Sequence, residues 1–146
     1  DAKIRLLASR SGALSIELGS VPAMPDEPLR VAIIALPVDG ADFRLRHKTT
    51  DRAFYDDARK AAPVDEVLFI DSEGNLTEGS FTCIYVERDG RLLTPPLARG
   101  LLPSVLRREL IESGRAVEAD LKVADLSGQF LLGNSLRGLI PARRVA

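Results

Sequence analysis

The chain has 146 residues and a formal net charge of −1, with one cysteine and one histidine. A chain of this length can bury a core of its own, so we expect one domain over residues 1–146. The near-neutral charge gives no electrostatic reason to expect nucleic acid or an acidic membrane surface as a partner. One cysteine excludes a disulfide framework and, with one histidine, argues against a zinc site made by the chain alone. No apolar run reaches membrane-spanning length and no signal-peptide pattern opens the chain, which indicates the cytoplasm.

The first half of the chain predicts short strands followed by one helix. Residues 3–8 and 13–18 are typical of a hairpin around Ser11-Gly12, and a third strand is expected over 30–36. Three prolines between the hairpin and the third strand favour an extended connection. A helix is expected over 51–61, because its apolar residues recur with helical spacing.

The second half predicts more short strands and a second helix. Strands over 66–71 and 81–87 are expected on either side of a turn-rich connection. A helix is expected over 103–113, since Pro103 suits a helix start and Gly114 suits the position after its end. Further short elements complete the pattern: strands over 91–94, 116–119, 129–132 and 139–143, and a helical turn at 124–126. Many short strands with two or three helices predict an α+β sheet domain.

Lys48 and Glu78 are the residues whose types suggest the most specific chemistry. Lys48 lies in Arg46-His47-Lys48-Thr49-Thr50, and Glu78 lies thirty positions later in Leu76-Thr77-Glu78-Gly79-Ser80. An aldehyde cofactor held as an imine needs a lysine whose amine can be freed, and a carboxylate beside a ring nitrogen keeps that nitrogen protonated. Taken alone, each residue also fits a simpler interpretation: Lys48 as a solvated charge and Glu78 as the flank of a strand.

Two segments of the second half are candidates for binding a phosphate group. Residues 100–107, with the sequence GLLPSVLR, predict a helix start, and residues 132–138, LGNSLRG, predict a small polar turn. Backbone N–H groups at a helix N-terminus or in such a turn bind anions. Each segment by itself is more often an ordinary helix start or a plain turn. The order and spacing of all four motifs together carry the functional interpretation.

In combination, these motifs resemble the fold type IV pyridoxal-phosphate enzymes, the class IV aminotransferase family. Within this family the chain is most similar to aminodeoxychorismate lyase-like domains, especially those fused behind component I of aminodeoxychorismate (para-aminobenzoate) synthase. The resemblance runs from about Lys3 to Val145, and it implies a mixed sheet or pseudo-barrel with flanking helices. The segments that carry it are residues 47–56, 65–69, 76–80, 94–97, 100–103 and 133–138.

The resemblance implies a role for each motif. Lys48 would form the imine with pyridoxal 5'-phosphate and act as general base, and Glu78 would pair with the pyridine nitrogen. The backbone amides of Val105, Leu106, Asn134 and Ser135 would hold the cofactor phosphate. His47, which has no partner motif, is interpreted as structural.

Two residues depart from the pattern of the family. Cys83 stands where relatives usually have asparagine, and Ser104 where they usually have glycine after the Leu-Pro of the phosphate turn. The second change asks a residue with a Cβ to fit a tight turn. Cys83 lies in an apolar, strand-like run, so we interpret it as a small buried hydrophobe and not as a nucleophile.

The resemblance also implies a reaction and its context. The leading expectation is an enzyme, a lyase that converts 4-amino-4-deoxychorismate to 4-aminobenzoate and pyruvate in folate biosynthesis. The alternatives are an aminotransferase acting on branched-chain or D-amino acids, and a non-catalytic fragment serving a synthase scaffold or dimer interface. Relatives carry a small N-terminal domain that this chain lacks, so we expect the large C-terminal domain of a longer enzyme. A homodimer, a small-molecule substrate and a synthase component I domain in the same polypeptide are the expected partners.

Overall fold

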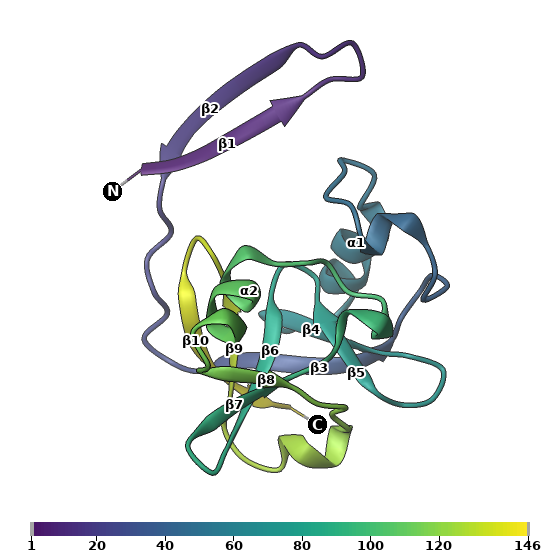
Figure 1. Ribbon diagram of the computed structural model, residues 1–146, viewed down its shortest axis with the longest axis vertical. Helices are drawn as coiled ribbons and strands as arrows, with labels where there is room; N and C mark the ends of the chain where they lie inside the picture. Colours follow the sequence, from purple (N-terminus) through teal and green to yellow (C-terminus); the bar gives the residue numbers. More distant parts are fainter. Residues whose placement is uncertain (1, 146) are drawn as a thin grey trace.

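The computed structural model describes residues 2–145, which form a two-stranded sheet, an eight-stranded sheet and two helices (Figure 1). The helices are α1 (Ala53–Ala61) and α2 (Val105–Glu112), and three short 3-10 turns are η1 (Phe43–Leu45), η2 (Leu97–Arg99) and η3 (Val123–Leu126). The strands are β1 (Ala2–Ala8), β2 (Leu14–Ser20), β3 (Leu29–Ala35), β4 (Glu66–Ile70), β5 (Leu76–Gly79), β6 (Cys83–Arg88), β7 (Arg91–Thr94), β8 (Ala116–Glu118), β9 (Phe130–Asn134) and β10 (Gly138–Arg144). The α+β class expected from the sequence is confirmed.

The hairpin of β1 and β2 stands away from the rest of the molecule (Figure 1). Its strands pair antiparallel, so that Ile4 faces Leu18 and Leu6 faces Ile16 across the ladder. These four side chains lie on one face of the hairpin and are 62 to 75% exposed. The expected hairpin and the extended connection after it are both present. The interpretation of residues 1–146 as one domain stays a prediction.

The eight-stranded sheet is mixed and curls until its two ends meet. Its strand order is β5-β4-β3-β10-β9-β6-β7-β8. Strand β3 runs parallel to both β4 and β10, and β7 runs parallel to β8, while the other pairs are antiparallel. Residues next to the two end strands join across the gap, because Asn75 bridges Lys122 and the Leu76 N–H donates to the Leu121 carbonyl at 2.8 Å. This closure corresponds to the pseudo-barrel that the family resemblance implies.

Alternating side chains give the sheet an inner and an outer core. On β4, Leu68 points into the interior of the curled sheet, whereas Val67 and Phe69 point outward and pack against α1. On β6, Ile84 points inward, and Cys83 and Tyr85 point outward beneath α2. Successive strand residues face opposite sides of a sheet, so each helix covers one part of the outer face. The first turns of both helices therefore lie on the outer side of the curled sheet.

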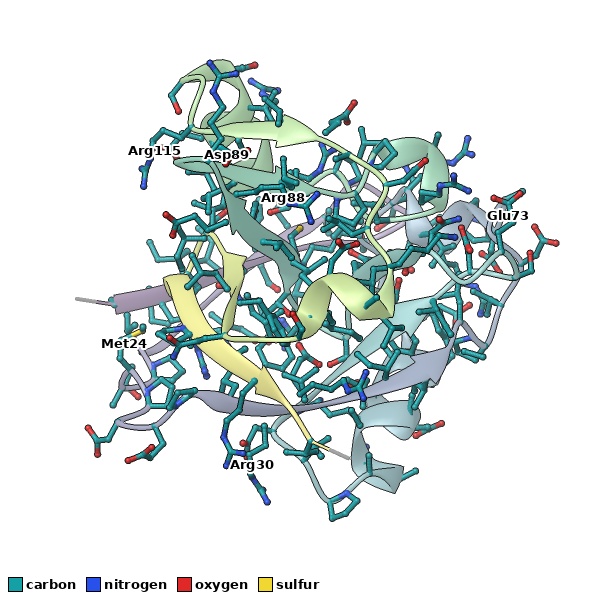
Figure 2. The ribbon with its side chains drawn as sticks, turned by 90° about the horizontal axis from the view of Figure 1, so that it is seen from below. Met24, Arg30, Glu73, Arg88, Asp89 and Arg115 are labelled. Carbon is teal, nitrogen blue, oxygen red and sulfur yellow. The ribbon has the colours of Figure 1, made fainter. Side chains whose placement is uncertain are left out.

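Seen from below, the side chains fill the space enclosed by the sheet, and Arg30, Glu73 and Arg115 lie at its periphery (Figure 2). No helix within residues 2–145 is long and apolar enough to cross a membrane.

Several boundaries differ from the sequence-based expectation by one or two residues, among them the starts of α1 and β6, and two differences bear on the candidate site. Leu76–Gly79 form β5, a strand that the sequence pattern did not predict, because all four residues are buried and polar Thr77 and Glu78 break the apolar alternation. Helix α2 begins at Val105 and not at Pro103, because Ser104 has an extended backbone with φ −70° and ψ 139°. The expectation of a helix start at Pro103 was wrong by two residues.

Candidate active site

Glu78 lies on β5 with its carboxyl group buried, at 4% exposure. The Tyr55 hydroxyl, from α1, donates a hydrogen bond to Oε1 of Glu78. The backbone N–H of Leu102, in the segment between η2 and α2, donates to Oε2 at 3.1 Å. Three segments that are far apart in sequence therefore fix this one carboxyl group. Each of its oxygens accepts one hydrogen bond.

The surroundings of Glu78 raise the proton affinity of its carboxyl group. Burial raises the pKa of the Glu78 carboxyl to about 7, and the hydrogen bonds from Tyr55 and Leu102 and the charges of Arg52 and Lys48 act in the opposite direction. Burial and the nearby Glu78 charge raise the pKa of the Tyr55 hydroxyl, so that Tyr55 stays a hydrogen-bond donor. A carboxyl group whose pKa lies near 7 is suited to exchanging a proton under physiological conditions.

Lys48 lies in the irregular segment between η1 and α1, and its side chain is exposed. Its positive charge is one of the influences that stabilise the carboxylate of Glu78. Arg52, four residues later, holds its guanidinium carbon 4.2 Å from the centre of the Tyr55 ring, where a cation is attracted to the aromatic face. The segment from Lys48 to Tyr55 therefore supplies a cationic surrounding for Glu78. His47, beside Lys48, is exposed.

The two candidate phosphate segments lie against each other. The Leu106 N–H, in the first turn of α2, donates to Oγ of Ser135 at 3.1 Å. The turn around Ser135 is closed by Oδ1 of Asn134, which accepts from the N–H groups of Leu136 and Arg137, each at 3.0 Å. N–H groups in the first turn of a helix have no partner within the helix. The structure thus brings a helix N-terminus and a polar turn, 29 residues apart, to one place.

Asn134 also connects this turn to the turn that follows Glu78. Its side-chain Nδ2 donates to the carbonyl of Phe81 at 3.2 Å, and Phe81 lies three residues after Glu78. The predicted site residues other than Lys48 therefore form one connected region. Lys48 influences the Glu78 carboxyl group through its positive charge, without a hydrogen bond to it. Their roles toward a cofactor stay predictions.

Both departures from the family pattern are accommodated. Ser104 has φ −70°, which any residue with a Cβ adopts without strain, so the turn does not require glycine. Cys83 is 3% exposed and packs against Leu110 of α2 in the outer core, which confirms the prediction of a small buried hydrophobe. Burial raises the pKa of the Cys83 thiol to about 11, so the sulfur is a poor nucleophile at neutral pH.

Three residues near Glu78 were missed by the sequence analysis. Tyr55 belongs to a quoted motif, but its place on the buried face of α1 depends on the packing of that helix against β4. Leu102 acts through its backbone N–H, which no side-chain pattern reveals. Glu66, at the start of β4, is fully buried beside the turn that follows Glu78. A charged residue at the head of an apolar strand was the available signal, since buried glutamates are rare.

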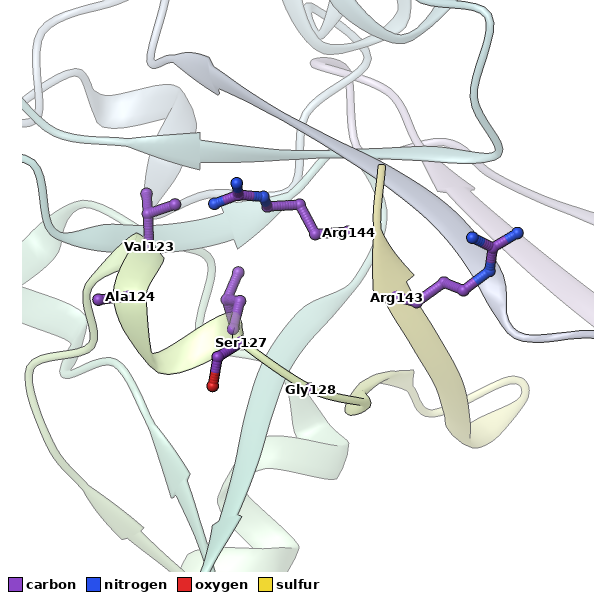
Figure 3. A pocket seen from close by; sticks show the side chains of 7 residues that line it. Val123, Ala124, Ser127, Gly128, Arg143 and Arg144 are labelled. Atoms are coloured by element: carbon purple, nitrogen blue, oxygen red, sulfur yellow. The ribbon is translucent and has the colours of Figure 1, made fainter. Parts of the chain in front are cut away.

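A separate hollow of about 440 Å³ lies between η3 and the end of β10. Arg144 extends from β10 toward Val123, whereas the adjacent Arg143 extends to the other side of the strand (Figure 3). Neither Lys48 nor Glu78 lines this hollow. The candidate active site is therefore at the outer face beneath α1 and α2, not in this depression.

The curled mixed sheet is the fold of the fold type IV class, and it carries a buried carboxyl group, a lysine and two adjoining N–H turns at the positions of the predicted site. Residues 2–145 match the family model described as "Amino-transferase class IV". The match covers nearly the whole chain, and the chain belongs to the class IV aminotransferase family. Pyridoxal phosphate is the cofactor of this family.

Individual relatives carry different names. A crystal structure from Mesorhizobium loti, provisionally named as an amino-acid aminotransferase, is 37% identical with a TM-score of 0.91 over 99% of this chain and 73% of that one. A Schizosaccharomyces pombe protein, provisionally named aminodeoxychorismate lyase, is 26% identical over 93% of this chain. The chain spans 64% of the length of that protein. A Mycobacterium tuberculosis protein described as a hypothetical aminotransferase, in its pyridoxal-phosphate-bound form, shares the fold, with a TM-score of 0.83 over 97% of this chain and 59% of that one at 23% identity.

The residues of this structure fit such a cofactor. A ring nitrogen needs an acidic partner in a dry place, and Glu78 is buried with a pKa near 7. A phosphate group needs converging N–H donors, and the first turn of α2 adjoins the Asn134-Ser135 turn. An aldehyde needs an accessible amine, and Lys48 is exposed beside the site. The donor set therefore agrees with the cofactor of the family.

Proposed function

We propose that this protein is a pyridoxal-phosphate enzyme that cleaves 4-amino-4-deoxychorismate to 4-aminobenzoate and pyruvate. The observation that carries the proposal of an enzyme site is the buried Glu78 carboxyl group, held by Tyr55 and Leu102 beside Lys48. Glu78 is buried and makes no salt bridge within residues 2–145, so its carboxyl group depends on the hydrogen bonds from Tyr55 and Leu102 to offset the cost of burial.

Lys48 and Glu78 would divide the proton chemistry between them. When bound, pyridoxal phosphate supplies an aldehyde that takes up the amino group of the substrate and a ring that accepts electrons. The Lys48 amine would hold the aldehyde between turnovers and move protons once it is freed. Glu78 would hold a proton at the ring nitrogen, and its buried setting strengthens that interaction because little water competes for it. Tyr55 and Leu102 would orient the carboxyl group.

The phosphate end of the site would be held by backbone donors. The N–H groups of Val105 and Leu106 lie in the first turn of α2, and those of Asn134 and Ser135 lie in the adjoining turn. The positive end of the α2 dipole favours an anion at this position. Buried Arg107 stabilises the helix, since its guanidinium donates to the Pro95 carbonyl at 2.9 Å and pairs with Glu118. These contacts support a fixed helix N-terminus.

The lyase assignment is supported by the likeness to the Schizosaccharomyces pombe protein, which extends over nearly the whole chain. An aminotransferase is the second candidate, because the Mesorhizobium loti structure is similar at higher identity. Both reactions use the same Lys48 and Glu78. The outcome therefore depends on what happens to the amino group of the substrate.

Turnover without an amino-group acceptor tests the reaction. The lyase releases pyruvate and 4-aminobenzoate from aminodeoxychorismate over many turnovers with no 2-oxo acid present. An aminotransferase must pass the amino group to a 2-oxo acid before a second turnover. Pyruvate measured with lactate dehydrogenase, with and without added 2-oxoglutarate, distinguishes the two reactions. Multiple turnovers only with the 2-oxo acid would assign the protein to the aminotransferases.

We also propose the assembly that the resemblance implies. The 146-residue chain would act together with a small N-terminal domain, as a homodimer, with a synthase component I domain in the same polypeptide. The chain alone is expected to release little pyruvate, and a polypeptide that includes the small domain is expected to release it readily. Full activity of residues 1–146 by themselves would contradict this part of the proposal. Light scattering of the longer polypeptide measures the dimer directly.

A further inference from the structure

Glu66, at the start of β4, is a fully buried carboxylate that accepts five hydrogen bonds. Its side chain is 0% exposed. Oε1 accepts from the N–H of Val67 at 2.9 Å, from the N–H of Ser80 at 3.1 Å and from the Ser80 hydroxyl at 2.5 Å. Oε2 accepts from the N–H of Phe81 at 3.2 Å and from the Thr82 hydroxyl at 3.0 Å. Four of these five donors belong to the turn that directly follows Glu78.

The turn closes tightly around this carboxylate. The Gly79 N–H donates to the Thr82 carbonyl at 2.7 Å, which brings the two ends of the turn together. A Cβ placed on Gly79 would lie 2.5 Å from Oγ1 of Thr82 and 3.0 Å from Oε2 of Glu66. Glycine is therefore needed next to Glu78, because the Glu66 carboxylate and the Thr82 hydroxyl fill the space that a side chain would take.

The hydrogen bonds at Glu66 run toward its carboxyl oxygens, and such bonds stabilise the ionised form against the effect of burial. Burial raises the pKa of the Glu66 carboxyl, and the hydrogen bonds from Ser80, Val67, Thr82 and Phe81 act in the opposite direction. Three of the five donors are N–H groups, which cannot accept a hydrogen bond from a protonated carboxyl group, whereas the Ser80 and Thr82 hydroxyls can. The structure thus holds two buried carboxyl groups with different surroundings, Glu66 among five donors and Glu78 between two.

The strand of Glu78 needs this additional support. Strand β5 has four residues, and its pairing with β4 is irregular between Leu68 and Ile70. Only Leu76 and Gly79 have partners in register on β4. The direction of the Glu78 side chain therefore depends on the turn at its end, which Glu66 holds from β4, as well as on the hydrogen bonds from Tyr55 and Leu102.

We propose that Glu66 is the positioning residue of Glu78: its buried carboxylate fixes the turn at residues 79–82, and the turn fixes where the Glu78 carboxyl group points and keeps water from it. The significance for catalysis rests on the proposed function, in which Glu78 meets the ring nitrogen. The positioning itself is a property of the protein without cofactor.

The test is the titration of Glu78 in the cofactor-free protein. Carboxyl carbons of glutamate are labelled with carbon-13, and the Glu78 signal is identified by its loss in Glu78→Gln. In Glu66→Gln, an amide nitrogen replaces one acceptor, the turn loosens and water reaches Glu78. The Glu78 titration midpoint is then expected to fall by about one pH unit from its position near 7. Glu87→Gln, the same change on the exposed end of β6, is expected to leave it in place.

A second variant separates positioning from the loss of a negative charge. Thr82→Val keeps the shape and the Glu66 charge but removes the donor to Oε2. Its Glu78 midpoint is expected to fall in the same direction by about half a pH unit, since one of five bonds is lost. A fall in Glu66→Gln with none in Thr82→Val would overturn positioning in favour of a charge effect. If Glu66→Gln does not fold, the Thr82→Val titration decides alone, and an unchanged midpoint refutes the proposal.

This outcome is independent of the proposed function. If Lys48 is not the residue that bonds pyridoxal phosphate, the proposed function fails while the Glu78 midpoint still reports on Glu66. In the reverse case, Lys48 bonds pyridoxal phosphate but the titration midpoint of Glu78 is unchanged in both variants. The enzyme assignment then stands, and the positioning role of Glu66 is refuted.

Discussion

The hydroxyl of Tyr55 on α1 donates a hydrogen bond to Oε1 of Glu78 on β5, and so joins a helix and a strand across 23 positions of sequence. Tyr55 is 1% exposed and its ring packs edge-on against Phe69 at 5.1 Å between centres. The contact therefore belongs to the outer core as well as to the candidate site. A change at Tyr55 affects both stability and the proton affinity of Glu78.

Tyr55→Phe keeps the packing of the ring and removes this hydrogen bond. We expect the free energy of unfolding to fall by about 1–3 kcal/mol, because a buried carboxyl oxygen loses its donor. The pKa of Glu78 should rise further, since the Tyr55 hydrogen bond acts to lower it. Urea denaturation measures the first effect. Tyr85→Phe is the matched control, because the buried Tyr85 hydroxyl has no hydrogen-bond partner within residues 2–145, and its removal should cost little.

Glu78 should make stability depend on pH in a definite direction. Its folded-state pKa of about 7 lies above its ordinary value of 4.5, so the stabilising contribution is complete below pH 4.5 and is lost as the pH rises through 7. Relative to Glu78→Gln, the wild-type protein should lose about 3 kcal/mol between these two pH values. Urea titrations of both proteins from pH 4.5 to 8 measure the difference. Parallel stability curves would show that the Glu78 pKa is not raised.

Lys48 should be the lysine that bonds pyridoxal phosphate. The chain has four lysines, at positions 3, 48, 60 and 122. After borohydride reduction of the protein with added cofactor, mass mapping should find the adduct on Lys48, and Lys48→Ala should lose both the adduct and its absorbance band. Lys122 is a useful comparison, because its amine already donates to the Glu73 carbonyl at 2.9 Å. An adduct on Lys3, Lys60 or Lys122 would assign the nucleophile elsewhere.

Ser135→Ala should separate the two turns at the phosphate end. The Leu106 N–H would lose the partner that it has at 3.1 Å, and its hydrogen exchange should become faster. The affinity for pyridoxal phosphate should fall about tenfold, because the hydrogen bond that holds together the two turns that supply the phosphate donors is lost. Exchange followed by NMR and fluorescence titration measure the two effects. Ser127→Ala, beside the separate hollow near η3, should change neither.

The sequence predicted the helices and strands whose apolar residues recur with a clear spacing. It missed the elements whose position depends on packing against the rest of the fold. The hairpin, α1 and most strands follow from alternation, helical spacing and turn residues, and their bounds agree within a few positions. Strand β5 has no such signal, because Thr77 and Glu78 are buried polar residues whose partners lie elsewhere in the fold. The start of α2 was misjudged because Pro103 is suited to a first helical turn, yet Ser104 after it remains extended.

The same limit applies to the candidate site. The motifs identified Lys48, Glu78 and the two phosphate segments by residue type and spacing. Tyr55, Leu102 and Glu66 could not be assigned in this way, because their roles arise from contacts between elements: a hydroxyl across 23 positions, a backbone N–H across 24 and a carboxylate beneath a turn. The sequence identifies the chemical groups, but the contacts around each group are set by the packing of the fold.

The closure of the sheet makes the length of one surface turn a geometric constraint. Asn75, whose backbone bridges Lys122 at the seam, comes directly after the turn at residues 71–74 and directly before β5. One residue added to that turn would shift the seam out of register and rotate the following side chains to the opposite face of the strand. Surface loops usually accept insertions, and this one is expected not to, because Glu78 lies only three residues beyond the seam.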